Sequence, residues 1–240
     1  MNENGINKIT VAERSGMGNT RNVLEKMGIF KLADQLDFNV VVLNEIEKED
    51  WIKIEKDGNH WLRGFYLPKL FLESRGIIQT CCLKTHRFGG HFTLSLKNSV
   101  GMVAKRLPGG IYDYMAELHM SPNQRKMIAE INMYYDVDIV VMDAMKAFIS
   151  KGPETGDLVE PQLLLASNDR VAIDAVGVAL LRKYGVKTGI QKGKIFDQSQ
   201  IKRAAELGIG AQSADEIELV ALNEESEKIV GIIENMFQKE

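Results

Sequence analysis

Apolar runs alternate with stretches of helical periodicity along the first part of the chain. Residues 7–13 (NKITVAE) predict a short strand, the glycine turn RSGMGNT follows, and residues 20–36 predict a helix with apolar positions at helical spacing. Residues 38–45 (FNVVVLNE) form a continuous apolar run, which is typical of a parallel strand covered on both faces. Together these segments predict a β-α-β unit.

The alternation continues to the C-terminus. Further strands are predicted within 73–83, over 137–143 and over 161–167. Further helices are predicted over 92–104, 122–133, 169–184, 198–207 and 224–239, with a short helix or strand over 214–219. Alternating strands and helices predict an α/β fold with a mostly parallel sheet flanked by helices.

No internal repeat or low-complexity linker interrupts this pattern, so we expect a single α/β domain over residues 1–240. The charged stretch at about 46–70 is predicted to be an inserted excursion with a hairpin around Asp57 and Gly58, because that dipeptide favours a turn. The loop at 84–121 is predicted to be a second insertion.

Composition and charge add mainly exclusions. The 240 residues are 45% hydrophobic and 26% charged with a net charge of −3, which is ordinary for a globular protein and excludes collagen-like, coiled-coil and disulfide-scaffold classes. No basic excess points to nucleic acid, no run approaches the length of a membrane span, and the polar start lacks the apolar segment of a signal peptide. We therefore expect a cytoplasmic protein with neither nucleic acid nor membrane as partner.

Two adjacent cysteines, Cys81 and Cys82, are the only ones in the chain. Neighbours in sequence cannot form an ordinary loop-closing disulfide, and two cysteines are too few for a cysteine-ligated iron–sulfur cluster. We expect small apolar side chains near a buried strand end, the alternative being a redox or metal role. Such sparse use of cysteine fits a reducing compartment.

Polar or ionisable side chains follow four of the predicted strands. They are Glu13, Arg14 and Ser15 after the first strand, Lys84, Thr85 and His86 after a later one, then Asp143, and finally Ser167, Asn168 and Asp169. In open parallel sheets, ligands bind beyond the carboxyl ends of the strands. The pattern predicts a shared site at this edge, the alternative being ordinary solvated loop starts.

The segment from Lys84 to His91 is the densest group of candidate chemistry. Lysine and arginine bind carboxylate or phosphate, so Lys84 and Arg87 suit an anion. Histidine acts as acid, base or metal ligand near neutral pH, which makes His86 a catalytic candidate. His86 and His91 with Asp143 form a candidate set for a divalent metal. The alternative is a solvated cationic loop.

Lys97 lies among apolar residues and therefore needs a partner such as Asp143, unless it extends to solvent from an amphipathic helix. Asn98 beside it could cap a helix or bind a backbone group. Asp174 lies within a helix that is apolar nearly all round, so its carboxylate must be paired, hydrogen-bonded or protonated. It is predicted to lie either at the site or in a buried structural network.

Three further positions are candidates for substrate binding through backbone or cap geometry. Gly152 and Gly156 lie in a tight loop that could turn backbone N–H groups toward a ligand, although a surface turn is the alternative. Asp169 or Asn168 is placed to cap the helix that follows. Ser15 begins the glycine turn, which lacks the lysine of a P-loop and the third glycine of a dinucleotide fingerprint, so a plain capped turn is its alternative.

Several of these segments match, in order and spacing, a known family. They are Lys84-Thr85-His86, Leu96-Lys97-Asn98 with Gly101 and Val103, Val141-Met142-Asp143, Gly152-Pro153 with Gly156, and Leu165-Ala166-Ser167 continuing from Asp169 through Asp174. Over roughly residues 8–210 the chain resembles domain-of-unknown-function family 362. The resemblance implies no established activity.

Two features of that family differ here. Some members carry a ferredoxin-like cysteine cluster, but this chain has no CxxCxxC motif. Members usually begin with an extra strand bearing a Lys-Pro-Asn-like motif, and nothing before Ile9 matches it. The architecture is also distantly similar to that of nickel-pincer lactate racemases, a likeness of fold that implies no shared function.

The leading hypothesis is an enzyme or binding protein for a small anionic metabolite. Lys84 and Lys97 would hold the anion, His86 would act as acid or base, and Asp143 or Asp174 would orient it or help bind a divalent metal. The alternative is a non-catalytic, redox-accessory or cofactor-handling protein, with a redox partner protein or a second copy of the chain as its partner. A third reading is a member whose site is vestigial.

Overall fold

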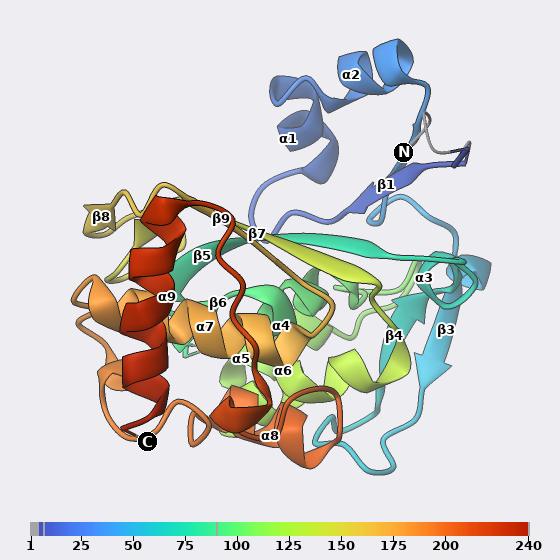
Figure 1. Cartoon of the computed structure of the whole chain (residues 1–240). Coiled ribbons are helices and arrows are strands. Elements are labelled where there is room, and N and C mark those ends of the chain that lie inside the picture. Colours follow the sequence, from blue (N-terminus) through green and yellow to red (C-terminus); the bar gives the residue numbers. More distant parts are fainter. Residues whose placement is uncertain (1–4, 7, 90, 240) are drawn as a thin grey trace.

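The computed structural model describes residues 5, 6, 8–89 and 91–239 and shows a mixed α/β protein (Figure 1). The strands are β1 (Thr10–Glu13), β2 (Asn39–Val42), β3 (Trp51–Ile54), β4 (Phe65–Pro68), β5 (Ile78–His86), β6 (His91–Thr93), β7 (Ile139–Phe148), β8 (Leu158–Val159) and β9 (Leu163–Ser167). The helices are α1 (Thr20–Lys26), α2 (Ile29–Leu36), α3 (Lys69–Leu72), α4 (Ser95–Asn98), α5 (Tyr114–Met120), α6 (Gln124–Ile131), α7 (Arg170–Lys183), α8 (Ser199–Glu206) and α9 (Glu224–Phe237).

The main sheet is mixed, so the prediction of a mostly parallel sheet is not confirmed. Its order is β6-β5-β7-β8, with β9 also paired to β7. Within the described residues only β5 and β7 run parallel in this sheet, whereas β6, β8 and β9 are antiparallel to their neighbours. This affects the predicted shared site, because the carboxyl end of β9 lies at the opposite edge of the sheet from that of β5.

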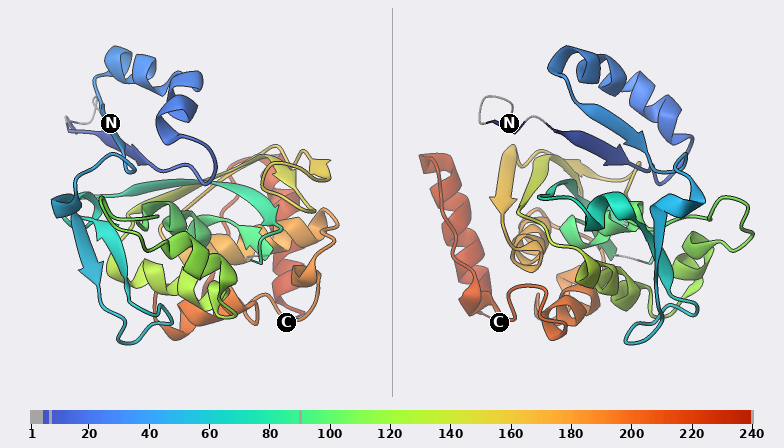
Figure 2. Two further views of the ribbon diagram at one scale, coloured as in Figure 1. Left: turned by 180° about the vertical axis from the view of Figure 1, so that it is seen from behind. Right: turned by 90° about the vertical axis from the view of Figure 1, so that its right-hand side faces the viewer.

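The predicted N-terminal β-α-β unit forms, but as a separate two-stranded parallel sheet of β1 and β2. The helix predicted over 20–36 is two helices, because Gly28 adopts a left-handed backbone (φ 74°) that ends α1 and precedes α2. Residue 7 of the predicted first strand lies outside the described residues. Figures 1 and 2 show this unit on one side of the main sheet, with α4 to α8 on the other.

The excursion at 46–70 folds as predicted into an antiparallel hairpin of β3 and β4. Gly58 takes a positive φ of 82° in the connecting loop, which is where the Asp-Gly dipeptide predicted the turn. Trp61 and Phe65 then pack into a second buried cluster with Leu118 and Met127. The excursion is therefore part of the folded body and not a free appendage.

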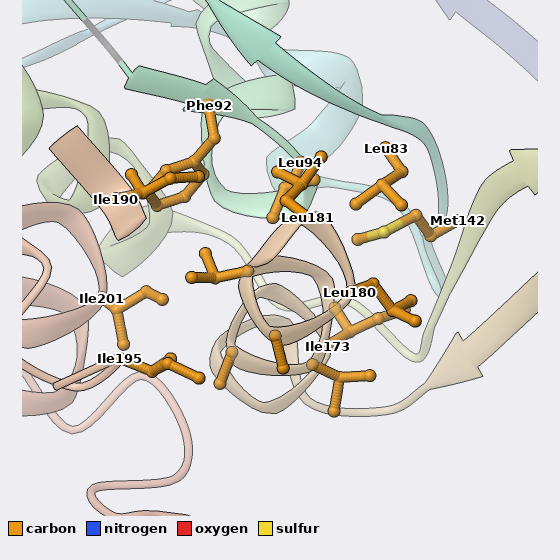
Figure 3. Close-up of a cluster of buried hydrophobic side chains, with 14 of the residues drawn as sticks. Leu83, Phe92, Leu94, Met142, Ile173, Leu180, Leu181, Ile190, Ile195 and Ile201 are labelled. Atoms are coloured by element: carbon orange, nitrogen blue, oxygen red, sulfur yellow. The ribbon is translucent and has the colours of Figure 1, made fainter. Parts of the chain in front are cut away.

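Helix α7 lies at the centre of the larger core (Figure 3). Its residues are buried almost throughout because it packs between the main sheet, α4 and α8. Leu83 from β5 and Met142 from β7 point toward Leu180, and Leu94 packs beside Leu181. The apolar composition of this helix on all sides predicted such burial.

Two segments differ from the predicted elements. The helix predicted over 92–104 is instead β6, the single turn α4 and a 3-10 turn, because the chain completes a hairpin with β5 before it turns. Within the predicted loop at 84–121, α5 forms where the side chain of Asp113 accepts hydrogen bonds from the backbone N–H groups of Met115 and Ala116. The 214–219 segment contains only a 3-10 turn at Ala214–Glu216.

One face of β5 and β7 packs on the helices and the other is largely open. Residues of β5 alternate accordingly, with Cys81 and Leu83 buried while Cys82 is exposed and Lys84 is half-buried. Among the helices that the structure describes, none is both long and apolar enough to cross a membrane.

Candidate functional site

The end of β5 and the turn α4 bring a histidine and a lysine together. His86 Nε2 lies 3.3 Å from Lys97 Nζ, although the two residues are eleven positions apart in sequence. The β5–β6 hairpin reverses the chain after His86, and α4 follows directly, so Lys97 returns to the end of β5. Lys84 lies two residues before His86, and its charge acts on both partners. We call Lys84, His86 and Lys97 the basic cluster.

Asp174 holds the turn that carries Lys97. Its fully buried carboxylate accepts hydrogen bonds from the backbone N–H groups of Ser95 (2.7 Å) and Leu96 (3.1 Å), which are the first residues of α4. A one-turn helix has no internal acceptors for these N–H groups, so the carboxylate from α7 acts as their acceptor. Burial raises the pKa of Asp174 to about 8, and the two backbone hydrogen bonds oppose that rise. Asp174 is thus a positioning residue for Lys97.

Asn98 fixes the other end of the same turn. Its side-chain amide donates to the carbonyl oxygen of Thr80 at 3.0 Å, which ties α4 to the middle of β5. The prediction that Asn98 binds a backbone group is confirmed. The predicted pairing of Lys97 with Asp143 does not form, because the ammonium contacts His86 instead.

The ammonium of Lys97 is buried, with only 7% of the residue exposed, and no carboxylate among the described residues forms an ion pair with it. Burial, followed by the positive charges of Lys84 and Arg14, lowers the pKa of Lys97 to about 8. A buried cation surrounded by other cations lacks the partner that normally offsets its desolvation.

His86 is neutral over the physiological pH range. Burial lowers its pKa to about 3, and the charge of Lys97 is the next cause, followed by His119, Lys84 and Arg87. The backbone N–H of Phe88 donates to His86 Nδ1 at 3.2 Å, which leaves the ring proton on Nε2, the atom that faces Lys97. The ring can therefore exchange a proton with whatever lies at the cluster.

Arg14 is a charged residue of this region that the sequence reasoning did not single out as a site residue. It is buried, and its guanidinium donates to the carbonyl oxygens of Val100 (2.6 Å) and Gly101 (3.2 Å) just beyond α4. Burial lowers its pKa, while Glu13 and Asp113 raise it. Its position directly after a predicted strand was the available signal. Arg14 attaches the N-terminal unit to the body and adds positive charge near Lys97.

The loop that follows β7 lies against the end of β5. The backbone N–H of Arg87 donates to the carbonyl oxygen of Gly152 at 3.3 Å, and Thr85 Oγ1 donates to the carbonyl oxygen of Phe148 at 3.0 Å. The side chain of Arg87 forms an ion pair with Glu154 and is therefore already engaged. Thr85 and Gly152 thus support the strand end, and Gly156 approaches the Ser150 carbonyl closely within the same loop.

Replacing Gly152 with alanine is expected to destabilise the protein by about 2–4 kcal/mol. A methyl group there would lie 2.0 Å from the carbonyl oxygen of Thr85, and the backbone φ of 36° disfavours any side chain. Urea unfolding measures the loss. Gly109 has a φ of 73° with open space around it, so Gly109→Ala is the control for backbone strain without a clash. Equal losses in the two variants would refute the tight contact between the loop and β5.

Other candidates lie apart from the basic cluster. Asp169 caps α7 through hydrogen bonds from Val171 (2.7 Å) and Ala172 (2.9 Å), as predicted, but the antiparallel direction of β9 puts it at the opposite edge of the sheet. Ser15 bonds to Thr20 within the glycine turn of the N-terminal unit.

Asp143 occupies a position within β7 and not at its end. It pairs in register with Cys82, so its exposed carboxylate lies on the open face that also carries Lys84. Its side chain accepts a hydrogen bond from the backbone N–H of Met145 at 2.8 Å. Asp143 is therefore near the cluster along the sheet without any contact to it in the described part of the chain.

The predicted metal set is not gathered in space. Across residues 5, 6, 8–89 and 91–239, no three or more His, Cys, Asp or Glu side chains lie close enough to share a metal ion, so His86, His91 and Asp143 do not form such a group. His91 Nε2 instead lies 2.8 Å from an Arg125 guanidinium nitrogen. Gly90, within the segment from Lys84 to His91, is outside the described residues.

The two cysteines face opposite sides of β5. Cys81 is buried, and burial raises the pKa of its thiol, which keeps it protonated. This agrees with the expected apolar role near a buried strand. Cys82 is exposed on the open face, and both thiols are free.

Comparison with known proteins gives a family but no activity. No curated protein and no solved structure matches the chain. The model of the family described as "Domain of unknown function (DUF362)" matches residues 1–179, a region that contains β5, α4 and most of α7, and hence the whole basic cluster with Asp174. By this match the chain belongs to the DUF362 family.

Proposed function

We propose that this protein is an enzyme that binds a small anionic metabolite at the basic cluster and uses His86 as its acid or base. The observation that carries the proposal is the buried ammonium of Lys97 without a carboxylate partner. Burying an unpaired charge costs several kcal/mol, and a ligand carboxylate or phosphate would supply the missing partner. Lys84, half-buried on the open face, offers a second cation from the solvent side.

The arrangement also supports chemistry beyond binding. A neutral imidazole with its proton on Nε2 can donate a hydrogen bond to a substrate oxygen and share that proton as negative charge develops there, which is one role of histidine in acid–base catalysis. Burial is the main cause of the low pKa of His86, and a bound anion would offset a further cause, the positive charges of Lys97 and Lys84. Substrate binding itself would thus raise this pKa toward the range in which proton transfer is efficient.

Calorimetric titration with oxalate tests the binding step, because oxalate carries two carboxylates and keeps its charge near neutral pH. We expect binding by the native protein and at least a tenfold loss, about 1.4 kcal/mol, in both Lys84→Met and Lys97→Met. Lys126→Met is the control, since Lys126 is exposed on α6. Absence of binding, or equal affinity in all variants, would refute the anion site.

The affinity for oxalate is expected to fall above pH 8, by about tenfold between pH 8 and 9.5. The pKa of Lys97 is about 8, so the ammonium loses its proton over this range, while Arg14 stays charged and His86 stays neutral. Affinities measured by calorimetry from pH 6.5 to 9.5 give the profile. Lys97→Arg keeps the charge and should flatten it. A native profile as flat as that of the arginine variant would contradict a role for the Lys97 charge.

A further inference from the structure

The hydrogen bonds around His86 bear on the protonation state of Lys97. Nδ1 accepts a hydrogen bond from the backbone N–H of Phe88, and a backbone N–H can only donate. The neutral ring therefore carries its proton on Nε2. Nε2 then donates to Lys97 Nζ at 3.3 Å, and a nitrogen can accept only as a free amine. The contact therefore favours loss of the Lys97 proton, so that a free amine with an available lone pair exchanges with the ammonium that attracts the anion.

The two lysines of the cluster differ in their surroundings. Lys84 is half-buried on the open face, whereas Lys97 is buried. Proximity of a second cation and burial are the two conditions that convert a lysine into a nucleophilic amine. Lys84 can hold an anionic group while Lys97 presents an amine.

We infer that Lys97 is a nucleophile that forms an imine with a small anionic substrate bearing an aldehyde or ketone carbonyl, such as a 2-oxo acid. This inference rests on the proposed anion site and adds the chemical class of the substrate. The carboxylate of such an acid is directly attached to its carbonyl carbon. Lys97 contacts His86 from the helical turn, and the charge of Lys84 on β5 acts on both of them. One residue of the cluster would hold the carboxylate while the other attacks the carbonyl.

The step balances with the groups present. The lone pair of Lys97 Nζ forms a bond to the carbonyl carbon as the carbon–oxygen π bond breaks, while the N–H at His86 Nε2 donates a hydrogen bond to the oxygen. One proton of Nζ passes through solvent to that oxygen, which gives a neutral carbinolamine. The carbon–oxygen bond then breaks, and the hydroxyl group leaves as water with the second proton of Nζ. The products are the imine and one molecule of water, His86 is unchanged, and no oxidant or reductant is consumed. The protonated imine would withdraw electrons from the neighbouring carbon, so that a bond there could break.

Trapping with glyoxylate tests the inference. The full-length protein is incubated with glyoxylate and sodium cyanoborohydride, which reduces an imine to a stable secondary amine, and the modified lysines are mapped by peptide mass spectrometry. We expect a carboxymethyl group on Lys97 at least tenfold faster than on exposed lysines such as Lys126, with protection by oxalate. Lys97→Arg, which keeps a cation but has no primary amine, should lose this adduct alone.

The outcomes separate this inference from the anion site on which it rests. Oxalate binding without faster labelling of Lys97 would overturn the imine and leave the anion site intact. Rapid labelling of Lys97 by acetaldehyde, an uncharged aldehyde, as fast as by glyoxylate, would show a reactive amine but overturn the anionic substrate class. If the adduct forms mainly on Lys84, the assignment of the nucleophile to Lys97 is wrong.

Discussion

Replacing Lys97 with methionine is expected to stabilise the protein by about 2 kcal/mol at pH 7 while it abolishes the affinity for oxalate. The folded protein binds a proton at Lys97 only below about pH 8, whereas the unfolded chain binds it below the ordinary value of 10.5. Below pH 8 the free energy of unfolding is therefore lowered by the amount that corresponds to the difference between the folded and unfolded pKa values of Lys97. Methionine has a similar unbranched shape and carries no charge to desolvate.

Urea unfolding of both proteins at several pH values measures this effect. The advantage of the methionine variant should be greatest below pH 8 and should shrink as the pH rises toward 10.5, since the native lysine then becomes neutral in both states. Lys126→Met, an exposed substitution, should change stability by less than about 0.5 kcal/mol. A methionine variant that is less stable at pH 7 would mean that Lys97 is paired in solution and is no candidate for an anion site.

Replacing Asp174 with alanine is expected to cost about 3–4 kcal/mol of stability and to abolish oxalate binding as well. The backbone N–H groups of Ser95 and Leu96 would lose their acceptor inside the core, and a cavity would remain. Asp174→Asn keeps one acceptor oxygen and should cost less. Because Asp174 contacts the turn and not the open face, its loss acts on binding through the position of Lys97.

Asp143→Ala is the matched control, since that carboxylate is exposed and accepts one backbone hydrogen bond. Its expected cost is below about 1 kcal/mol. A second readout is pH: because burial raises the pKa of Asp174 to about 8, native stability should decline as the pH rises from about 4 to 8, and Asp174→Asn should remove that slope. Equal costs for the alanine variants at 143 and 174 would refute the role of Asp174 in holding α4.

Local elements were predictable where one pattern dominated. Helix α7 is apolar on nearly every side, so its burial and its cap at Asp169 could be predicted directly. The direction of β9 could not be predicted from its apolar run, because an apolar run does not indicate whether a strand is parallel or antiparallel to its neighbour. The connection from 149 to 162 gave a signal that was missed: it contains no helical pattern, and a parallel crossover usually needs a helix.

The site was predictable as a set of residue types but not as an arrangement. Lys84 and His86 share a strand, so their proximity follows from sequence, and Lys97 was a candidate because a lysine among apolar residues needs a partner. Lys97 contacts His86 and not Asp143 because of the β5–β6 hairpin. This hairpin was not predicted, since residues 92–104 were predicted to form a helix. The role of Asp174 depends on tertiary packing between distant segments.

The bond from Asp174 to the turn at Ser95 spans 79 residues of chain, and this has a consequence for synthesis on the ribosome. Residues up to α4 emerge long before α7 does, and during that interval the first N–H groups of the turn have no carboxylate to bind. A nascent chain that ends before α7 therefore keeps the Asn98–Thr80 bond but lacks the carboxylate that holds the start of the Lys97 turn. The basic cluster takes its final arrangement only after α7 has left the exit tunnel, so this arrangement forms together with the mature fold.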